Sequence, residues 1–178
     1  MGDSFNINSV ESLKNYEISM NEVSDVSSII KEMILIKNDK KRVVKKQTLP
    51  YNIEDKIKLN NIPKNLAELL TRKHIDAYDI VDEAVISLEE FNACLREDLY
   101  DFYYEIYIDI LNSMKINFDD LDSIKVSSGE IYTKLNKLIK IELFENKVTK
   151  IPENKIDTYI SAITAYVFYK CKFLIPIE

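Results

Sequence analysis

Glycine, histidine and cysteine are scarce in this chain of 178 residues, and the first two scarcities each exclude a kind of site. Gly2 and Gly129 are the only glycines. A loop that cradles the phosphates of a nucleotide needs several residues that adopt positive φ or let the backbone approach closely, so P-loop and dinucleotide-binding sites are excluded. His74 is the only histidine, which excludes metal centres built from several histidines.

The two cysteines, Cys94 and Cys171, both fall on the apolar side of helical patterns. We expect buried free thiols rather than a disulfide. Two thiols in a chain of this length, without an N-terminal leader of charged, apolar and small residues, indicate a reducing compartment. The expected location is therefore the cytoplasm.

The net charge of −6 argues against a protein whose main task is to coat nucleic acid. Basic residues nevertheless gather between residues 37 and 46, where they could contact phosphates. No aromatic residues are interleaved with them to stack on bases, so any DNA contact would be weak, made to the backbone and sensitive to salt. A charged connector is the alternative interpretation. The candidate phosphate contacts are Lys40, Lys41, Arg42, Lys45 and Lys46.

A very apolar stretch, residues 154–178, closes the chain. A helix that is apolar almost all round is buried, so we expect the other helices to assemble around this one. Asp157, Lys170 and Lys172 interrupt the apolar run, which is shorter than the ~20 residues that span a bilayer, and we expect no membrane association. The apolar residues that recur at steps of three and four are Ile156, Tyr159, Ile160, Ile163, Val167 and Cys171.

Helical spacing of apolar residues also predicts earlier helices. The first is expected over residues 24–36, with Ser24 as its N-cap and Asp25 in its first turn, and another over residues 64–86. Residues 1–23 show no sustained period and predict an arm of low intrinsic order.

Two capping-box patterns predict where later helices begin. Ser87 and Glu90 have the spacing that starts a long helix. Ser127 and Glu130 have it for another helix, which follows a loop around residues 118–126.

Five or six helices with brief links predict a mostly α fold, a compact helical bundle with an extended N-terminal arm. We divide the chain into residues 1–49, which hold the arm, a short helix and the basic connector, and residues 50–178, which form the helical domain.

Three features bear on catalysis. His74 would need an orienting carboxylate and a nucleophile nearby to act as a general base, and Cys171 lies in apolar surroundings that raise the pKa of a thiol. Glu97, Asp101 and Glu105 share one helix face and could bind a divalent cation, although a solvated helix face is the ordinary interpretation. We expect no catalysis, cofactor or metal.

Tyrosines are frequent on the long helix expected after residue 87 and on the last helix. Tyrosine is enriched at the cores of protein interfaces, where the ring packs and the hydroxyl reaches water or a partner. The alternative is that these rings fill the core of this chain itself. The candidate partner-binding residues are Tyr100, Tyr103, Tyr104, Tyr107, Tyr166 and Tyr169.

Two motifs at opposite ends of residues 50–178 resemble the C-terminal helical domain of bacterial ABC-three-component, Lamassu-like defence systems. That domain tends to begin with Ile-x-x-Lys-Ile-x-x-Asn and to end with an aromatic-bearing helix that runs into Cys-Lys-aliphatic. The matching residues are Ile53, Lys56, Ile57 and Asn60 at the first end, and Phe168, Cys171, Lys172 and Leu174 at the second.

The resemblance implies an assembly of an SMC-like ABC ATPase, a small middle subunit and an effector, often a nuclease or protease, to which the helical domain is usually appended. Only the arm, helix and connector of residues 1–49 precede the matched region here. We therefore expect a free-standing adaptor or a fragment of a longer effector.

Our first hypothesis is a non-catalytic protein-interaction subunit of a bacterial antiviral defence complex, which docks on the SMC-like ATPase, the middle subunit or the effector and could oligomerise. The second is a metal-dependent nuclease or RNase toxin that uses Glu97, Asp101 and Glu105. The third is a small acidic immunity or inhibitor protein, whose charge would mask a basic partner.

Overall fold

The structure, a computed structural model, describes residues 20–39, 53–145, 153–170 and 173–176, with side chains for all of these except residues 20–24, 73–77, 144–145 and 153–155. The predicted N-terminal arm lies largely outside the described residues. So do the basic residues Lys40, Lys41, Arg42, Lys45 and Lys46, as well as Cys171 and Lys172.

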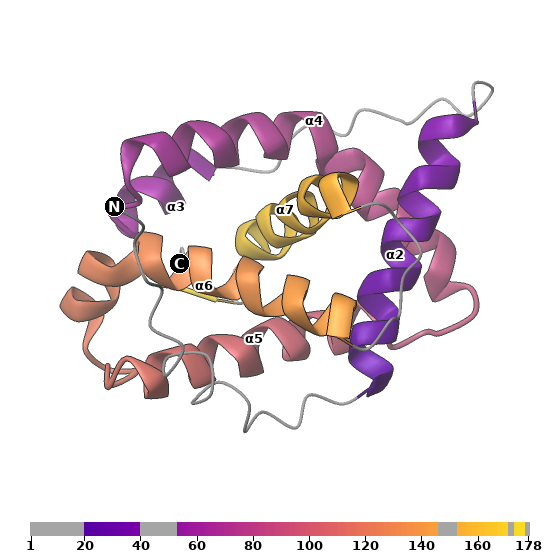
Figure 1. The fold of residues 1–178 in the computed structure, drawn as a ribbon. Coiled ribbons are helices and arrows are strands. Elements are labelled where there is room, and N and C mark those ends of the chain that lie inside the picture. The colour runs from indigo at the N-terminus through magenta and orange to yellow at the C-terminus, as the bar shows by residue number, and fades with distance from the viewer. Residues whose placement is uncertain (1–19, 40–52, 146–152, 171–172, 177–178) are drawn as a thin grey trace, which may run out of the picture.

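The described residues form six helices, which confirms the predicted compact, mostly α fold (Figure 1). In the described part of the chain no residue is in a strand. The helices are α2 (Met20–Asn38), α3 (Ile53–Leu59), α4 (Lys64–Glu89), α5 (Leu95–Ser113), α6 (Leu121–Glu145) and α7 (Glu153–Tyr169).

Helix α7 lies in the middle of the fold, where it packs against α4, α6 and α2 (Figure 1). In its apolar stripe Ile156, Ile160, Ile163 and Val167 are buried and Tyr159 is partly buried. Ala162, Ala165, Tyr166 and Phe168, on its other faces, are buried as well. The small alanine side chains let neighbouring helices approach closely. The prediction of a central, solvent-shielded last helix is therefore confirmed.

The end of this helix differs from the prediction. Helix α7 stops at Tyr169 instead of continuing to the end of the chain, and residues 173–176, here called the tail, are not helical. Leu174 adopts φ 58°, in the left-handed region, and Pro176 follows two residues later. Both features are incompatible with a continuing α-helix.

Helix α2 packs against α4 and shares its core with the later helices. It begins at Met20, ahead of the predicted cap at Ser24, because nothing between Met20 and Ser24 is a proline or glycine that would end a helix. In the described part of the chain, α2 therefore contributes to the same core as the later helices. The buried residues of α2 include Val26, Ile29, Ile30, Met33 and Ile36.

The two predicted capping boxes are also wrong. Ser87 lies inside α4, where its hydroxyl donates to Glu32 Oε1 at 3.1 Å, and α4 continues to Glu89. Helix α6 begins at Leu121, ahead of Ser127, because Asp120 supplies the cap. The Ser123 backbone N–H donates to Asp120 Oδ1 at 3.0 Å.

Gly129 lies where α6 packs closely against Pro63, in the turn that precedes α4. A Cβ atom at this position would lie 2.7 Å from Pro63 Cγ. The absence of a side chain thus lets α6 pack directly on the Pro63 ring, next to α3.

Candidate functional site: a clasp between α3 and the tail, and the adjoining groove

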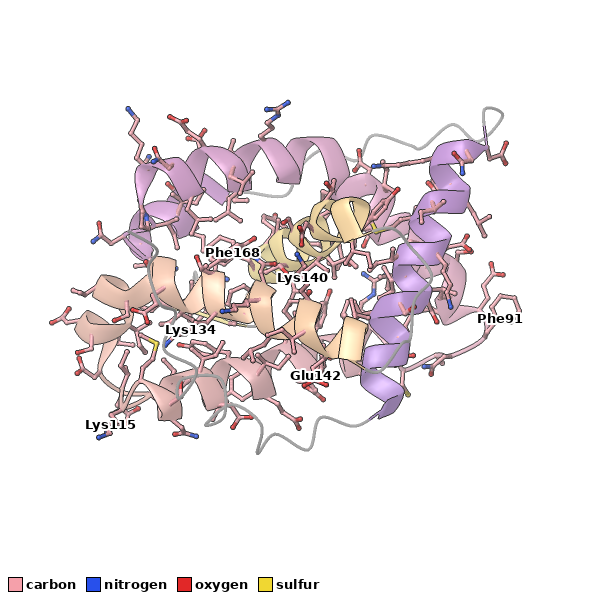
Figure 2. All side chains as sticks on the ribbon, in the orientation of Figure 1. Phe91, Lys115, Lys134, Lys140, Glu142 and Phe168 are labelled. Carbon is pink, nitrogen blue, oxygen red and sulfur yellow. The ribbon has the colours of Figure 1, made fainter. Side chains whose placement is uncertain are left out.

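Lys56 of α3 is buried against the end of α7. Its side chain is 1% exposed, and its Nζ donates to the carbonyl of Phe168 and, at 3.2 Å, to that of Phe173. The ammonium also lies 4.3 Å from the centroid of the Phe168 ring, which points into the interior of the bundle (Figure 2). The last carbonyls of a helix have no intrahelical partner and carry the negative end of its dipole, so Lys56 caps α7.

Asn60 holds the tail from the same side. It is fully buried, and its side chain pairs with both backbone groups of Ile175: Oδ1 accepts from the N–H at 2.8 Å and Nδ2 donates to the carbonyl at 3.0 Å. Nδ2 also donates to the Lys56 carbonyl at 3.0 Å. These bonds define the position of the tail along α3, and we call the contacts of Lys56 and Asn60 with Phe168, Phe173 and Ile175 the clasp.

The tail inserts the ring of Phe173 into an aromatic cage. Phe173 is 1% exposed, and four rings from α5, α6 and α7 surround it at centroid distances of 5.6–6.3 Å. Such contacts add stabilisation to the burial of apolar area, of about 0.5–1.5 kcal/mol for each pair. The rings of the cage belong to Tyr103, Tyr107, Tyr132 and Phe168.

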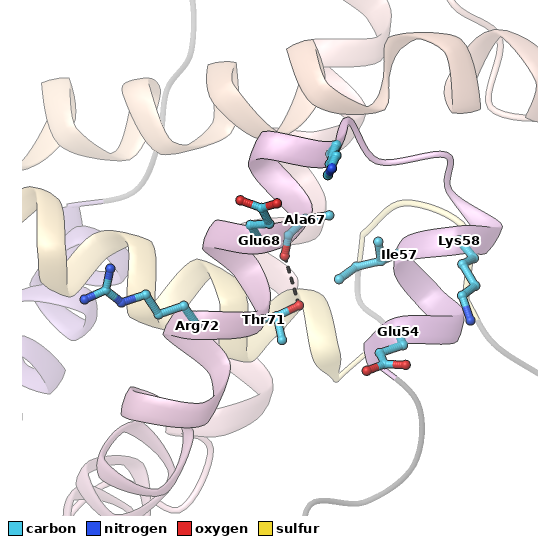
Figure 3. Close-up of a pocket in the computed structure, with 8 residues that line it drawn as sticks. Glu54, Ile57, Lys58, Ala67, Glu68, Thr71 and Arg72 are labelled. Atoms are coloured by element: carbon cyan, nitrogen blue, oxygen red, sulfur yellow. Dashed lines mark hydrogen bonds between the residues drawn. The ribbon is translucent and has the colours of Figure 1, made fainter.

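A groove of about 580 Å³ lies beside the clasp, between α3 and α4 (Figure 3). Ile57 points from α3 toward α4, and Ala67 lies across from it; both are partly buried. Thr71 uses its hydroxyl within α4, where it donates to the Ala67 carbonyl at 2.9 Å. Charged side chains line the rest of the groove: Glu54, Lys58, Lys64, Glu68 and Arg72.

The groove thus combines an apolar floor with a rim of three basic and two acidic side chains. The lining residues that the structure describes include no histidine or cysteine and no pair of groups arranged as nucleophile and base. An apolar strip bordered by charges is typical of the surfaces that bind other proteins, above all an amphipathic helix.

A second polar cluster joins α4, α5 and α7 at the other side of the core. Arg96 bonds Glu89 with two nitrogens, at 2.9 and 3.0 Å, and Asp82 at 2.9 Å. Tyr166 donates to Asp82 Oδ1 at 2.6 Å. Burial alone would raise the pKa of Asp82, but the hydrogen bonds from Tyr166 and Arg96 outweigh it and leave this pKa below its usual value. The cluster orients three helices.

The tyrosines proposed as partner-binding residues have different positions. Tyr104 is 42% exposed, and Tyr169 is partly buried against Tyr78. The other four pack inside this chain, with exposures of 5% or less, so the alternative interpretation as core residues applies to them in this fold. They are Tyr100, Tyr103, Tyr107 and Tyr166.

The carboxylates proposed for metal binding lie along an exposed face of α5. Among the side chains that the structure describes, no three histidine, cysteine, aspartate or glutamate residues converge where a metal could bind. Glu97, Asp101 and Glu105 therefore remain a set of neighbours on a solvated face. Cys94 is exposed and precedes α5, contrary to the prediction of a buried thiol, and the side chain of His74 is outside the described set.

Lys56 and Asn60 are site residues whose structural role the sequence analysis missed, although both belong to the motif that carries the family resemblance. A lysine and an asparagine in a helical segment ordinarily predict a solvated face. Apart from the Lys56 carbonyl that Asn60 contacts, their bonding partners are backbone atoms more than a hundred residues away. No pattern along the chain identifies such partners.

No protein-family model, curated protein or solved structure matches this chain. None of the described helices has the length and apolar character that crossing a membrane requires.

Proposed function

We propose that this chain is a non-catalytic protein-interaction subunit whose partner binds in the groove between α3 and α4. The observation that carries this proposal is the groove itself, an apolar floor of Ile57 and Ala67 inside a charged rim. Because basic side chains outnumber acidic ones there, we expect the partner to contribute an amphipathic helix with acidic flanks.

The family resemblance supplies the kind of assembly. Its two motifs, which are far apart in sequence, include the residues that form the clasp beside the groove: Lys56 and Asn60 from the first, Phe168 from the second. We therefore propose a bacterial antiviral defence complex of the ABC-three-component type. The SMC-like ABC ATPase and its small middle subunit are the partners to test first.

A direct test is reconstitution of this chain with a purified ATPase and middle subunit of the ABC-three-component type. Binding is measured by calorimetry for the wild type and for Ala67→Trp, which fills the groove floor with a large ring. Ala93→Trp is the matched control, because Ala93 is exposed in the turn between α4 and α5.

We expect micromolar or tighter binding by the wild type and the Ala93→Trp variant, and at least a tenfold loss for Ala67→Trp. Absence of binding to either subunit would refute the proposed assembly. Equal binding by the two tryptophan variants would show that the partner uses another surface. A second pair of variants tests the role of charge in binding. Lys58→Glu reverses a charge on the rim of the groove, and Lys31→Glu, at an exposed position of α2, is its control.

A further inference from the structure

We infer that the tail, residues 173–176, is a strap that holds α3 in place and thereby shapes the groove. The inference rests on the proposed function only where it concerns partner binding. Its structural part concerns α3 and the tail alone.

Among the described residues, helix α3 buries few side chains besides Lys56. It is seven residues long, too short to be stable on its own, and Lys56 is its one fully buried side chain. Ile53 and Ile57 are only partly buried. In the described part of the chain, the bonds from Lys56, and from Asn60 in the turn after α3, to α7 and the tail therefore contribute much of what anchors this helix.

The tail provides a large share of those bonds. If it left its position, Asn60 would lose both bonds to Ile175, and Lys56 would lose the Phe173 carbonyl. The buried Asn60 Oδ1 would then lack the Ile175 N–H donor, which is unfavourable unless water reaches it, while Lys56 and Asn60 Nδ2 would keep their bonds to the carbonyls of Phe168 and Lys56. Release of the tail thus favours movement of α3 toward water, which removes one wall of the groove.

Opposing forces act on the tail itself. The insertion of Phe173 and the bonds to Asn60 favour the docked position. The side chain of Leu174 is also buried, which favours docking, whereas its φ of 58° is unfavourable for a residue with a branched side chain.

Coupling between tail and groove follows from this arrangement. A partner that binds the groove against α3 needs α3 in place, and α3 needs the tail. By linkage, docking of the tail strengthens partner binding, and a bound partner strengthens docking of the tail. A factor that captured or removed the tail would release the partner.

Hydrogen exchange of the full chain tests the structural part without any partner. Phe173→Ala should speed exchange of the α3 amides by at least tenfold relative to those of α5. Met33→Ala, a buried truncation in α2, is the control and should not single out α3. If Phe173→Ala does not fold, Phe173→Leu should show the same selectivity with a smaller increase.

Unchanged α3 exchange in the folded Phe173 variant, or equal acceleration of α3 and α5, would overturn the inference. The coupling is then measured as the affinity of the Phe173 variant for the middle subunit or ATPase, with an expected tenfold loss. If the wild type binds neither subunit, the proposed function fails while the α3 result still decides the role of the tail.

Discussion

The side-chain amide of Asn60 lies along the backbone of Ile175 and pairs with both its N–H, at 2.8 Å, and its carbonyl, at 3.0 Å. An asparagine side chain offers a carbonyl acceptor and two N–H donors, so it can pair with the N–H and the carbonyl of one residue as a neighbouring backbone segment would. The turn after α3 and the tail after α7 are therefore positioned together.

Replacement of Lys56 by methionine should destabilise the chain although methionine has a similar length and no charge to bury. The carbonyls of Phe168 and Phe173 would lose a donor, at a cost of about 1–3 kcal/mol for unsatisfied buried groups. Urea denaturation measures the change. Lys58→Met is the control, because Lys58 is exposed and lies two residues further along α3. It should change the free energy of unfolding by less than about 0.5 kcal/mol. Equal effects would contradict a buried role for Lys56.

Gly129→Ala should be destabilising even though alanine is favoured over glycine in a helix by about 1 kcal/mol. The new Cβ would lie 2.7 Å from Pro63 Cγ, an atom of a stiff ring, and overpacking of this kind costs about 1–3 kcal/mol. In a Pro63→Ala background the clash disappears, and the same substitution should become stabilising. A double-mutant cycle measured by thermal unfolding tests this reversal of sign, and a destabilising effect in both backgrounds would count against the contact.

Asp82→Asn should lower stability at pH 7 by about 2–3 kcal/mol, because Arg96 and Tyr166 lose a charged partner. The pKa of Asp82 lies below its ordinary value of 3.8, since hydrogen bonds from Tyr166 and Arg96 outweigh the effect of burial. A carboxyl of this kind adds stability that is present above its unfolded pKa and is lost as the pH falls through its folded pKa. The gap between variant and wild type should therefore narrow below about pH 4.

Urea midpoints measured from pH 7 to pH 2 give this comparison. Asp101→Asn, on the exposed face of α5, is the control and should stay within about 0.5 kcal/mol of the wild type at pH 7. A gap for Asp82→Asn that is the same at every pH would show that its charge contributes nothing.

Neighbouring tyrosines of α5 should respond differently to truncation. Tyr103 is fully buried, and its hydroxyl lies 3.1 Å from Thr164 Oγ1, so Tyr103→Ala should cost about 3–5 kcal/mol. Tyr104 is 42% exposed, and Tyr104→Ala should cost less than about 1 kcal/mol. Chemical denaturation of both variants checks this, and a large loss for Tyr104→Ala would contradict the described packing.

Periodicity along the chain was sufficient to predict that the fold is helical and that α7 is central. Stripes such as Ile156, Ile160 and Ile163 repeat within a few residues, and burial of a helix that is apolar on every side needs no knowledge of its neighbours. Helix starts were predicted less well. Ser87 and Ser127 have the local pattern of caps, but they lie inside α4 and α6.

The tyrosines show why the site was harder to predict than the fold. A ring at Tyr103 and a ring at Tyr104 suit a core or an interface equally well, and only the direction of each side chain relative to the packed helices separates them. The groove likewise depends on where α3 lies against α4, which no spacing within either helix determines.

The sequence by itself determined the helical class, the buried nature of the last helix and the absence of nucleotide-binding glycine loops, because these depend on composition and on repeats of three and four residues. Tertiary structure alone decided the clasp. Lys56 and Asn60 bond to backbone atoms 112 to 117 residues away, and backbone atoms are the same at every position of a chain. Their meeting is therefore a property of the folded arrangement, in which the end of α7 and the tail lie beside α3.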